Sequence, residues 1–179
     1  MPTAAEKMPP TAVRYVEGDA TAPGGPGTKI IAHCCNNVGV WGAGFVMALS
    51  RRWDRPEGEY RAWAERHGAG FQALLGAMQL VPVESDVIVA NIIGQSGVVG
   101  RMAKGKIPVR YEAIAKGFGF IAQYAKDHPE KTVSVHMPRI GCALAGGSWA
   151  QIEPLIDRAF VTTNIPVTVY DWPGGTFNP

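Results

Sequence analysis

One stretch indicates the class of fold: Lys29-Ile30-Ile31-Ala32-His33-Cys34-Cys35, followed by Asn36-Asn37-Val38-Gly39-Val40-Trp41-Gly42-Ala43-Gly44. Its first part is a nearly continuous apolar run, which is typical of a strand covered on both faces. A glycine-bearing loop follows, and Phe45, Ala48, Leu49 and Arg52 then recur at helical spacing. This order predicts a strand, a loop and a helix in an α/β domain.

The rest of the chain supports the same class. We expect further strands over 13–17, 77–83, 86–93, 132–137 and 166–170, and helices over 45–53, 60–66, 110–126 and 149–160. The later half alternates strand and helix, whereas 77–93 holds a strand pair. The pattern predicts a three-layer α/β/α domain with a mixed central sheet over 13–179, preceded by a flexible Pro-containing tail over 1–12.

Composition limits the function. The 179 residues carry 17 Lys and Arg against 15 Asp and Glu, a net charge of +2, which argues against sequence-independent binding of duplex DNA. No apolar run is long enough to span a membrane, and 1–11 lacks the apolar core of a signal peptide. The 3 cysteines do not resemble a disulfide framework, so we expect a cytoplasmic protein. We also expect a monomer.

Two glycine loops are candidate anion sites. The first spans 36–44 and precedes a helix, and there is no Asp or Glu between Asp19 and Asp54. Glycines turn backbone N–H groups inward, and a helix N-terminus adds partial positive charge, so the loop suits a phosphate or diphosphate. An ordinary strand–helix turn is an equally good interpretation of this loop alone. The second loop, 137–149, is also acid-free and leads into a helix, and the pair favours a diphosphate clamp.

Four strings of residues resemble the macrodomain family. They are Val16-Glu17-Gly18-Asp19-Ala20, Ile30-Ile31-Ala32-His33-Cys34-Cys35-Asn36, Trp41-Gly42-Ala43-Gly44-Phe45 and Met137-Pro138-Arg139-Ile140-Gly141-Cys142-Ala143-Leu144. The resemblance covers about 13–170. The chain is similar to the branch of this family that holds the terminal ADP-ribose protein glycohydrolase and the glycohydrolases acting on ADP-ribosylated DNA thymidine. It implies a macrodomain that binds ADP-ribose and removes it from modified targets.

The resemblance also implies the ligand contacts. Asp19 matches the acid that reads the adenine amino group, although an Asx-turn at a strand end is the simpler interpretation of that residue alone. We expect Tyr170 and Asp171 to close over the adenine. The complete set of expected ADP-ribose contacts is Gly18, Asp19, Ala20, Asn36, Trp41, Gly42, Ala43, Gly44, Phe45, Arg139, Ile140, Gly141, Cys142, Ala143, Leu144, Tyr170 and Asp171.

Two positions depart from the family pattern. The terminal glycohydrolase uses a lysine and an aspartate in its reaction. The lysine position corresponds to about Gly94 or Gln95 in this chain, and the aspartate position corresponds to Ala145. A covalent lysyl–ribose intermediate needs an amine there, so the sequence does not support that route. We expect Asn37 and Gln95 to orient a water molecule, with the substrate's own phosphate activating it. Cys35 and Cys142 have no basic neighbour, which favours buried packing roles.

Several alternatives remain open at this stage. Trp41 suits stacking on the distal ribose and packing under the loop equally well, and His33 suits a core position. The segment 94–107 carries Arg101, Lys104 and Lys106. It is either a solvated loop or a contact for the group to which ADP-ribose is attached. We expect no metal or cofactor, with ADP-ribosylated protein or single-stranded DNA as the partner. A non-catalytic ADP-ribose reader is the alternative function.

Overall fold

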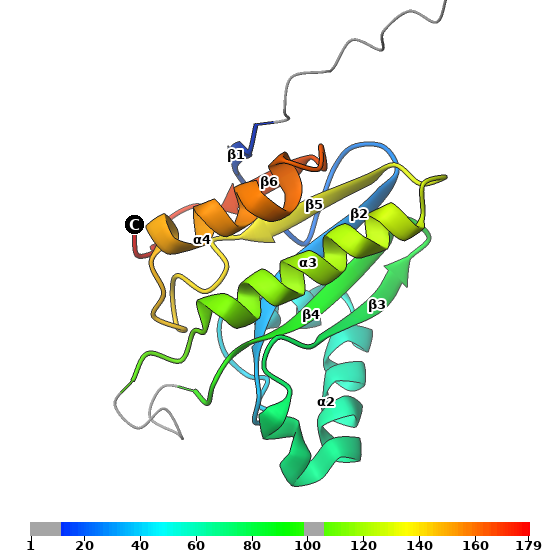
Figure 1. Cartoon of the computed structure of the whole chain (residues 1–179). Coiled ribbons are helices and arrows are strands. Elements are labelled where there is room, and N and C mark those ends of the chain that lie inside the picture. The colour runs from blue at the N-terminus through cyan, green and yellow to red at the C-terminus, as the bar shows by residue number, and fades with distance from the viewer. Residues whose placement is uncertain (1–11, 99–105) are drawn as a thin grey trace, which may run out of the picture.

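A single six-stranded sheet forms the centre of the molecule (Figure 1). The computed structural model describes residues 12–98 and 106–179, so the tail predicted over 1–12, except its last residue, and the loop residues Arg101 and Lys104 lie outside the described residues. The strand order is β1-β6-β5-β2-β4-β3. The strands are β1 (Arg14–Glu17), β2 (Thr28–Asn36), β3 (Met78–Glu84), β4 (Val87–Gln95), β5 (Val133–Pro138) and β6 (Val167–Asp171).

The direction of the strands confirms the predicted mixed sheet. The strand β3 runs antiparallel to β4, and every other neighbouring pair is parallel. In β2, Ile30 and Ala32 belong to one buried cluster and Ile31 and Cys35 to the other, as the period-two geometry of a strand requires. Both faces of β2 are therefore covered, which explains its continuous apolar sequence.

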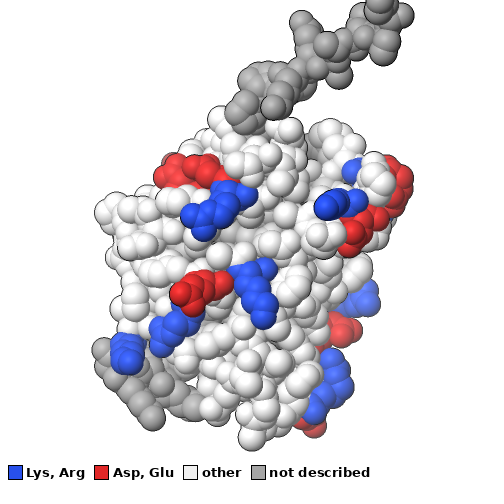
Figure 2. Space-filling view, viewed as in Figure 1, with Lys and Arg blue, Asp and Glu red and all other residues white. Residues whose placement is uncertain are grey.

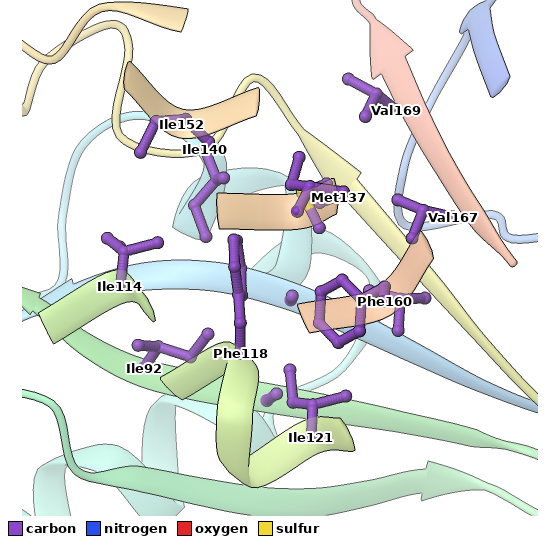
Figure 3. Packing of buried hydrophobic residues seen from close by; sticks show 14 of the residues in the cluster. Ile92, Ile114, Phe118, Ile121, Met137, Ile140, Ile152, Phe160, Val167 and Val169 are labelled. Carbon is purple, nitrogen blue, oxygen red and sulfur yellow. The ribbon is translucent and has the colours of Figure 1, made fainter. Parts of the chain in front are cut away.

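Helices cover the two faces of the sheet. The helices are α1 (Phe45–Arg52), α2 (Arg55–His67), α3 (Tyr111–Asp127) and α4 (Trp149–Ile156), with a 3₁₀ turn η1 (Gly68–Ala73) and a π turn η2 (Asp157–Val161). The elements α3, α4 and η2 bury one cluster, and α1, α2 and η1 bury the other. In the first cluster Phe118 and Phe160 lie next to each other, with ring centroids 5.2 Å apart (Figure 3).

One glycine lets α3 approach the sheet closely. A Cβ atom at Gly117 would lie 2.4 Å from Ile92 Cγ2, so no side chain fits between α3 and β4 at this point. The buried residues Ile114, Phe118 and Ile121 lie on the same face of α3. This close packing fixes α3 against the sheet behind the second glycine loop.

The structure extends or shortens some predicted elements. The helix α2 begins at Arg55 rather than 60, because Pro56 stands in its first turn, where a missing N–H costs no bond within the helix. The helix predicted over 149–160 is α4 followed by the π turn, with Pro154 inside α4. The 3₁₀ turn η1 was not predicted, because its glycines mask any periodic pattern.

The described surface mixes charges of both signs. On the face shown in Figure 2, Lys and Arg side chains lie among Asp and Glu side chains rather than in one stripe. In residues 12–98 and 106–179, no helix combines the length and apolar character needed to cross a membrane.

Candidate functional site

A cleft crosses the edge of the sheet where the parallel strands end. Loops after parallel strands meet at the same edge, which is where open α/β sheets bind ligands. Two neighbouring cavities of about 410 and 280 Å³ share Gly44, Phe45, Pro138, Tyr170 and Trp172. The two cavities adjoin at these residues and together form a cleft whose lining extends from Asp19, after β1, to Gln95, at the end of β4.

The lining contains most of the residues predicted as ligand contacts. The smaller cavity contains Gly18, Asp19 and Ala20, and the larger one contains the predicted residues Ala43, Gln95, Arg139, Ile140, Gly141, Ala143, Leu144 and Asp171. Gly44, Phe45 and Tyr170 line both. The tertiary structure thus brings together residues from both glycine loops and from the ends of β1 and β6.

The two glycine loops approach each other over the cleft. A Cβ atom at Gly44 would lie 3.1 Å from Leu144 Cδ1, so a side chain of the second loop touches the first loop. Gly44 has a φ of 79°, in the left-handed region that favours glycine, and α1 begins at the next residue. The N-terminus of α1 therefore faces the cleft beside this contact, as an anion site requires.

The Asp19 end of the cleft is a turn as well as a cavity wall. The Oδ1 atom of Asp19 accepts hydrogen bonds from the backbone N–H and the hydroxyl of Thr21, both at 2.8 Å. This is the Asx-type turn that the sequence favoured. The half-buried carboxylate nevertheless lines the smaller cavity, so the turn holds it beside the cleft.

Tyr170 stands above a buried polar chain. Its hydroxyl lies 2.8 Å from His136 Nδ1, and His136 Nε2 lies 2.8 Å from the Ser134 hydroxyl. Burial and then the charge of Lys29 lower the pKa of His136 to about 4. The imidazole is therefore neutral at physiological pH, and it orients Tyr170 without adding charge beneath the cleft.

The Gln95 end of the cleft has buried neutral groups in its floor. Burial lowers the pKa of His33 to about 4, and His33 Nε2 donates to Asn91 Oδ1. Burial raises the pKa of the Cys34 thiol to about 12, so it is not a thiolate nucleophile. Gln95 donates from Nε2 to the Gly97 carbonyl at 3.0 Å.

A side chain at position 94 would displace its neighbours. A Cβ atom at Gly94 would lie 2.3 Å from Ile114 Cδ1 and 2.8 Å from Cys34 Sγ. Glu17 and Asp171 are the carboxylates in the lining of the larger cavity, and both lie at the β1–β6 end. Among the described residues, the Gln95 end thus has neither an amine nor a carboxylate in the cavity lining.

Five predicted contacts lie outside the lining of both cavities: Asn36, Asn37, Trp41, Gly42 and Cys142. Cys142 is buried and Gly42 is exposed. Asn36 instead shapes the first loop, since its Oδ1 accepts from Val38 N, Val40 N and the Tyr60 hydroxyl.

Asn37 and Trp41 are likewise engaged within the fold. Asn37 Nδ2 donates to the Gln72 carbonyl, and its Oδ1 accepts from Gly97 N at 2.9 Å. Trp41 is 5% exposed and donates from its ring nitrogen to the Ser50 hydroxyl, which is the packing role that the sequence left open.

Some lining residues were not predicted from the sequence. The segment 172–177 supplies Trp172, Gly174, Gly175, Thr176 and Phe177 to the larger cavity. An aromatic residue followed by Pro-Gly-Gly just after the last strand was the available signal. The smaller cavity also contains Ala48 and Arg51. They follow Gly44 by four and seven positions, and they therefore lie on the same face of α1 as Gly44.

Within 12–98 and 106–179, no group of three or more His, Cys, Asp or Glu side chains is arranged to hold a metal ion.

Curated relatives match most of the chain. It is 31% identical over 177 residues to a chromodomain-helicase-DNA-binding protein 1-like from Mus musculus, covering 94% of this chain and 19% of that protein. It therefore spans under a fifth of that relative's length. It is 26% identical to an ADP-ribose glycohydrolase from Homo sapiens, covering 88% of this chain and 90% of that one. It is 24% identical to an ADP-ribose 1″-phosphate phosphatase from Meyerozyma guilliermondii, covering 87% and 98%.

Solved structures show the family. No family model matches the sequence. A protein of unknown function from Bacteroides thetaiotaomicron is 46% identical with a TM-score of 0.82, covering 90% of this chain and 98% of that chain. A macrodomain protein from Streptomyces coelicolor is 51% identical with a TM-score of 0.73, covering 89% and 99%. With this identity over nearly the whole of both chains, and with a cleft framed by two glycine loops, the chain belongs to the macrodomain family.

Proposed function

We propose that this macrodomain is a hydrolase that removes mono-ADP-ribose from modified targets. The bound product is ADP-ribose, with its adenine at the Asp19 end, its diphosphate beneath the Gly44–Leu144 contact and its distal ribose at the Gln95 end. The human relative is named as an ADP-ribose glycohydrolase and the fungal one as an ADP-ribose 1″-phosphate phosphatase, and both names are consistent with this class of ligand.

The extent of the lining of this cleft is the observation that carries the proposal. The lining extends from Asp19 to Gln95 and includes two glycine loops that carry no acidic residue, while Glu17 and Asp171 line its β1–β6 end. A nucleoside diphosphate sugar needs this arrangement, with an acceptor for the base, backbone donors for the phosphates and a neutral end for the sugar. The N-terminus of α1 adds favourable partial charge at the middle of the cleft.

Gln95 carries the catalytic role in this proposal. Gln95 lines the larger cavity, and in this proposal its amide orients a water molecule toward the anomeric carbon of the distal ribose. The water oxygen bonds to the anomeric carbon while the bond from that carbon to the acceptor breaks. A phosphate oxygen of the substrate accepts the proton from the water and passes it to the departing acceptor group. Since neither Gly94 nor Gln95 is a lysine, a lysyl intermediate at that position plays no part in this proposal.

The linkage follows from the same end of the cleft. A neutral pocket without an acid offers nothing to a guanidinium, so we expect little activity on arginine linkages. We expect activity on esters of acidic residues in proteins, or on thymidine-linked ADP-ribose in single-stranded DNA. Of the basic residues Arg101, Lys104 and Lys106, the structure describes Lys106, and this residue is exposed.

A comparison of initial rates tests the proposal. The purified chain is incubated with ADP-ribose linked to glutamate, serine, arginine or thymidine, and with ADP-ribose 1″-phosphate. Release of ADP-ribose from the glutamate or thymidine substrate is the expected result. A preference for the arginine linkage would refute the assignment of linkage, and no release from any substrate would refute catalysis.

The second candidate is a non-catalytic ADP-ribose reader. It is favoured by Gly94 or Gln95 at the position of the glycohydrolase branch's lysine and by Ala145 at the position of its aspartate. Calorimetry with free ADP-ribose, beside the rate measurement, separates the two. Binding without turnover identifies a reader, and the absence of binding contradicts both functions.

A further inference from the structure

Arg139 and Asp171 form an ion pair in the wall of the cleft. Arg139 directly follows β5, and Asp171 is the last residue of β6. The Arg139 Nε and Nη2 atoms donate to the two carboxylate oxygens of Asp171, at 2.7 and 2.8 Å. This two-bond geometry is the strong form of an arginine–carboxylate contact, and it occupies one edge of the guanidinium.

Three aromatic rings surround the same guanidinium. Its central carbon lies 4.0 Å from the ring centre of Phe177, 4.7 Å from that of Tyr15 and 4.8 Å from that of Trp149. The Trp149 ring nitrogen donates to the Tyr15 hydroxyl. Only 16% of the Arg139 side chain is exposed. We call Arg139, Asp171, Tyr15, Trp149 and Phe177 the Arg139 cluster.

The cluster joins five separate parts of the chain. Tyr15 belongs to β1, Arg139 follows β5, Trp149 begins α4, Asp171 ends β6 and Phe177 lies in the C-terminal segment 172–179. Backbone bonds continue this junction, because Asn178 N donates to the Cys142 carbonyl and Trp149 N donates to the Asn178 carbonyl, at 2.8 and 2.9 Å. The segment is thereby attached to the second glycine loop and to the start of α4.

The attached segment is a wall of the larger cavity. Trp172, Gly174, Gly175, Thr176 and Phe177 line it, together with Ala43 and Gly44 of the first loop. Trp172 is 58% exposed and lines both cavities, whereas Gly174, Gly175, Thr176 and Phe177 line only the larger one. Loss of this wall would open the larger cavity and leave most of the Asp19 cavity intact.

We propose that Arg139 is a positioning residue for the ligand cleft: paired with Asp171 and packed on Phe177, it holds the segment 172–177 as the wall that determines binding of the diphosphate and distal sugar. It does not itself bind the ligand's phosphates, because Asp171 occupies its paired donors and the aromatic rings enclose its faces. The identity of the ligand rests on the proposed function, but the positioning role does not.

The experiment compares Arg139→Lys, Asp171→Asn and the double variant with the wild-type chain. Hydrogen exchange is measured in the ligand-free proteins at the amides of 174–178, and calorimetry measures the affinity for ADP-ribose and for adenosine monophosphate. Glu59→Gln, which removes the carboxylate of the exposed Arg55–Glu59 pair on α2, is the matched control.

The proposal predicts faster exchange at 174–178 in both single variants and unchanged exchange in Glu59→Gln. It also predicts ADP-ribose affinity about tenfold weaker in each single variant and little weaker again in the double, with adenosine monophosphate affinity within about twofold of wild type. Unchanged exchange in Asp171→Asn would overturn it. So would a loss of ADP-ribose affinity in Arg139→Lys together with unchanged or tighter binding in Asp171→Asn, since that pattern identifies a direct phosphate contact. Failure of the wild-type chain to bind ADP-ribose would contradict the proposed function, while the exchange data would still decide the positioning role.

Discussion

Gly44 and Leu144 meet across the cleft, with 3.1 Å between Leu144 Cδ1 and the place that a Cβ atom at residue 44 would occupy. These residues belong to two glycine loops that are 100 positions apart, and Leu144 is 58% exposed although it is apolar. Leu144 lines the larger cavity and Gly44 lines both cavities, so we expect their contact to influence ligand binding.

Substitution of Gly44 tests this contact. We expect Gly44→Ala to weaken ADP-ribose binding by roughly tenfold, because the methyl group meets Leu144 and the positive φ adds strain of about 1 kcal/mol. Gly44→Glu adds a charge beside the diphosphate and abolishes measurable binding.

Calorimetry measures the affinity of these variants for ADP-ribose. The control is Gly58→Ala on α2, where nothing lies within 4 Å of the added atom. The double variant Gly44→Ala/Leu144→Ala should recover part of the affinity, and no recovery would show that the contact is unimportant.

Asp19 has two separable roles. Asp19→Ala removes both the turn acceptor and the carboxylate, and we expect ADP-ribose affinity to fall by about 1–3 kcal/mol. Thr21→Val removes the hydroxyl bond to Oδ1 and leaves the carboxylate in place, so its affinity should stay close to that of wild type. Calorimetry and urea unfolding on the same samples separate binding from stability. Equal loss of affinity in both variants would mean that the carboxylate acts through the turn alone.

Gln95 should affect turnover more than binding. Gln95→Ala removes the amide that orients water, so we expect kcat to fall about tenfold or more while the affinity for product ADP-ribose changes little. Single-turnover rates on the preferred substrate provide the measurement. Gln151→Ala, at an exposed position of α4, is the control. A loss confined to KM would make Gln95 a binding residue.

Two buried histidines should make the fold sensitive to acid. Burial lowers the pKa of His33 and of His136 from 6.5 to about 4. The unfolded chain therefore binds more protons than the folded one between these values, so stability is fully present above pH 6.5 and falls as pH drops toward 4. Each histidine should lower the free energy of unfolding by about 2 kcal/mol between pH 7 and 5.

Urea unfolding at pH 7 and 5 measures this loss. His136→Gln and His33→Gln should each show a smaller difference between the two pH values than the wild-type chain. The exposed His67→Gln serves as the control and should keep the wild-type difference. A wild-type difference retained in His136→Gln would show that His136 does not carry this dependence.

Local patterns were enough to predict the class of fold and the two loops. The apolar run at 29–35 identifies a strand covered on both faces, because alternate side chains of a strand point to opposite layers. The acid-free glycine loops indicate where an anion can approach backbone donors, since that property depends on the loop's own residues. The start of α2 was missed, because its first residues are polar and carry no apolar period.

Three assignments depended on contacts between residues far apart in the chain. Asn36 and Trp41 belong to the first glycine loop, but Tyr60 and Ser50 hydrogen-bond to their side chains within the fold. Arg139 stands in an anion-clamp sequence, yet it pairs with Asp171, 32 positions away. The sequence by itself determined the layers, the mixed sheet and the loops, because hydrophobic period and glycine content act locally. Only the tertiary structure decided which polar side chains face the cleft, because a hydrogen-bond partner that is remote in sequence orients each of them.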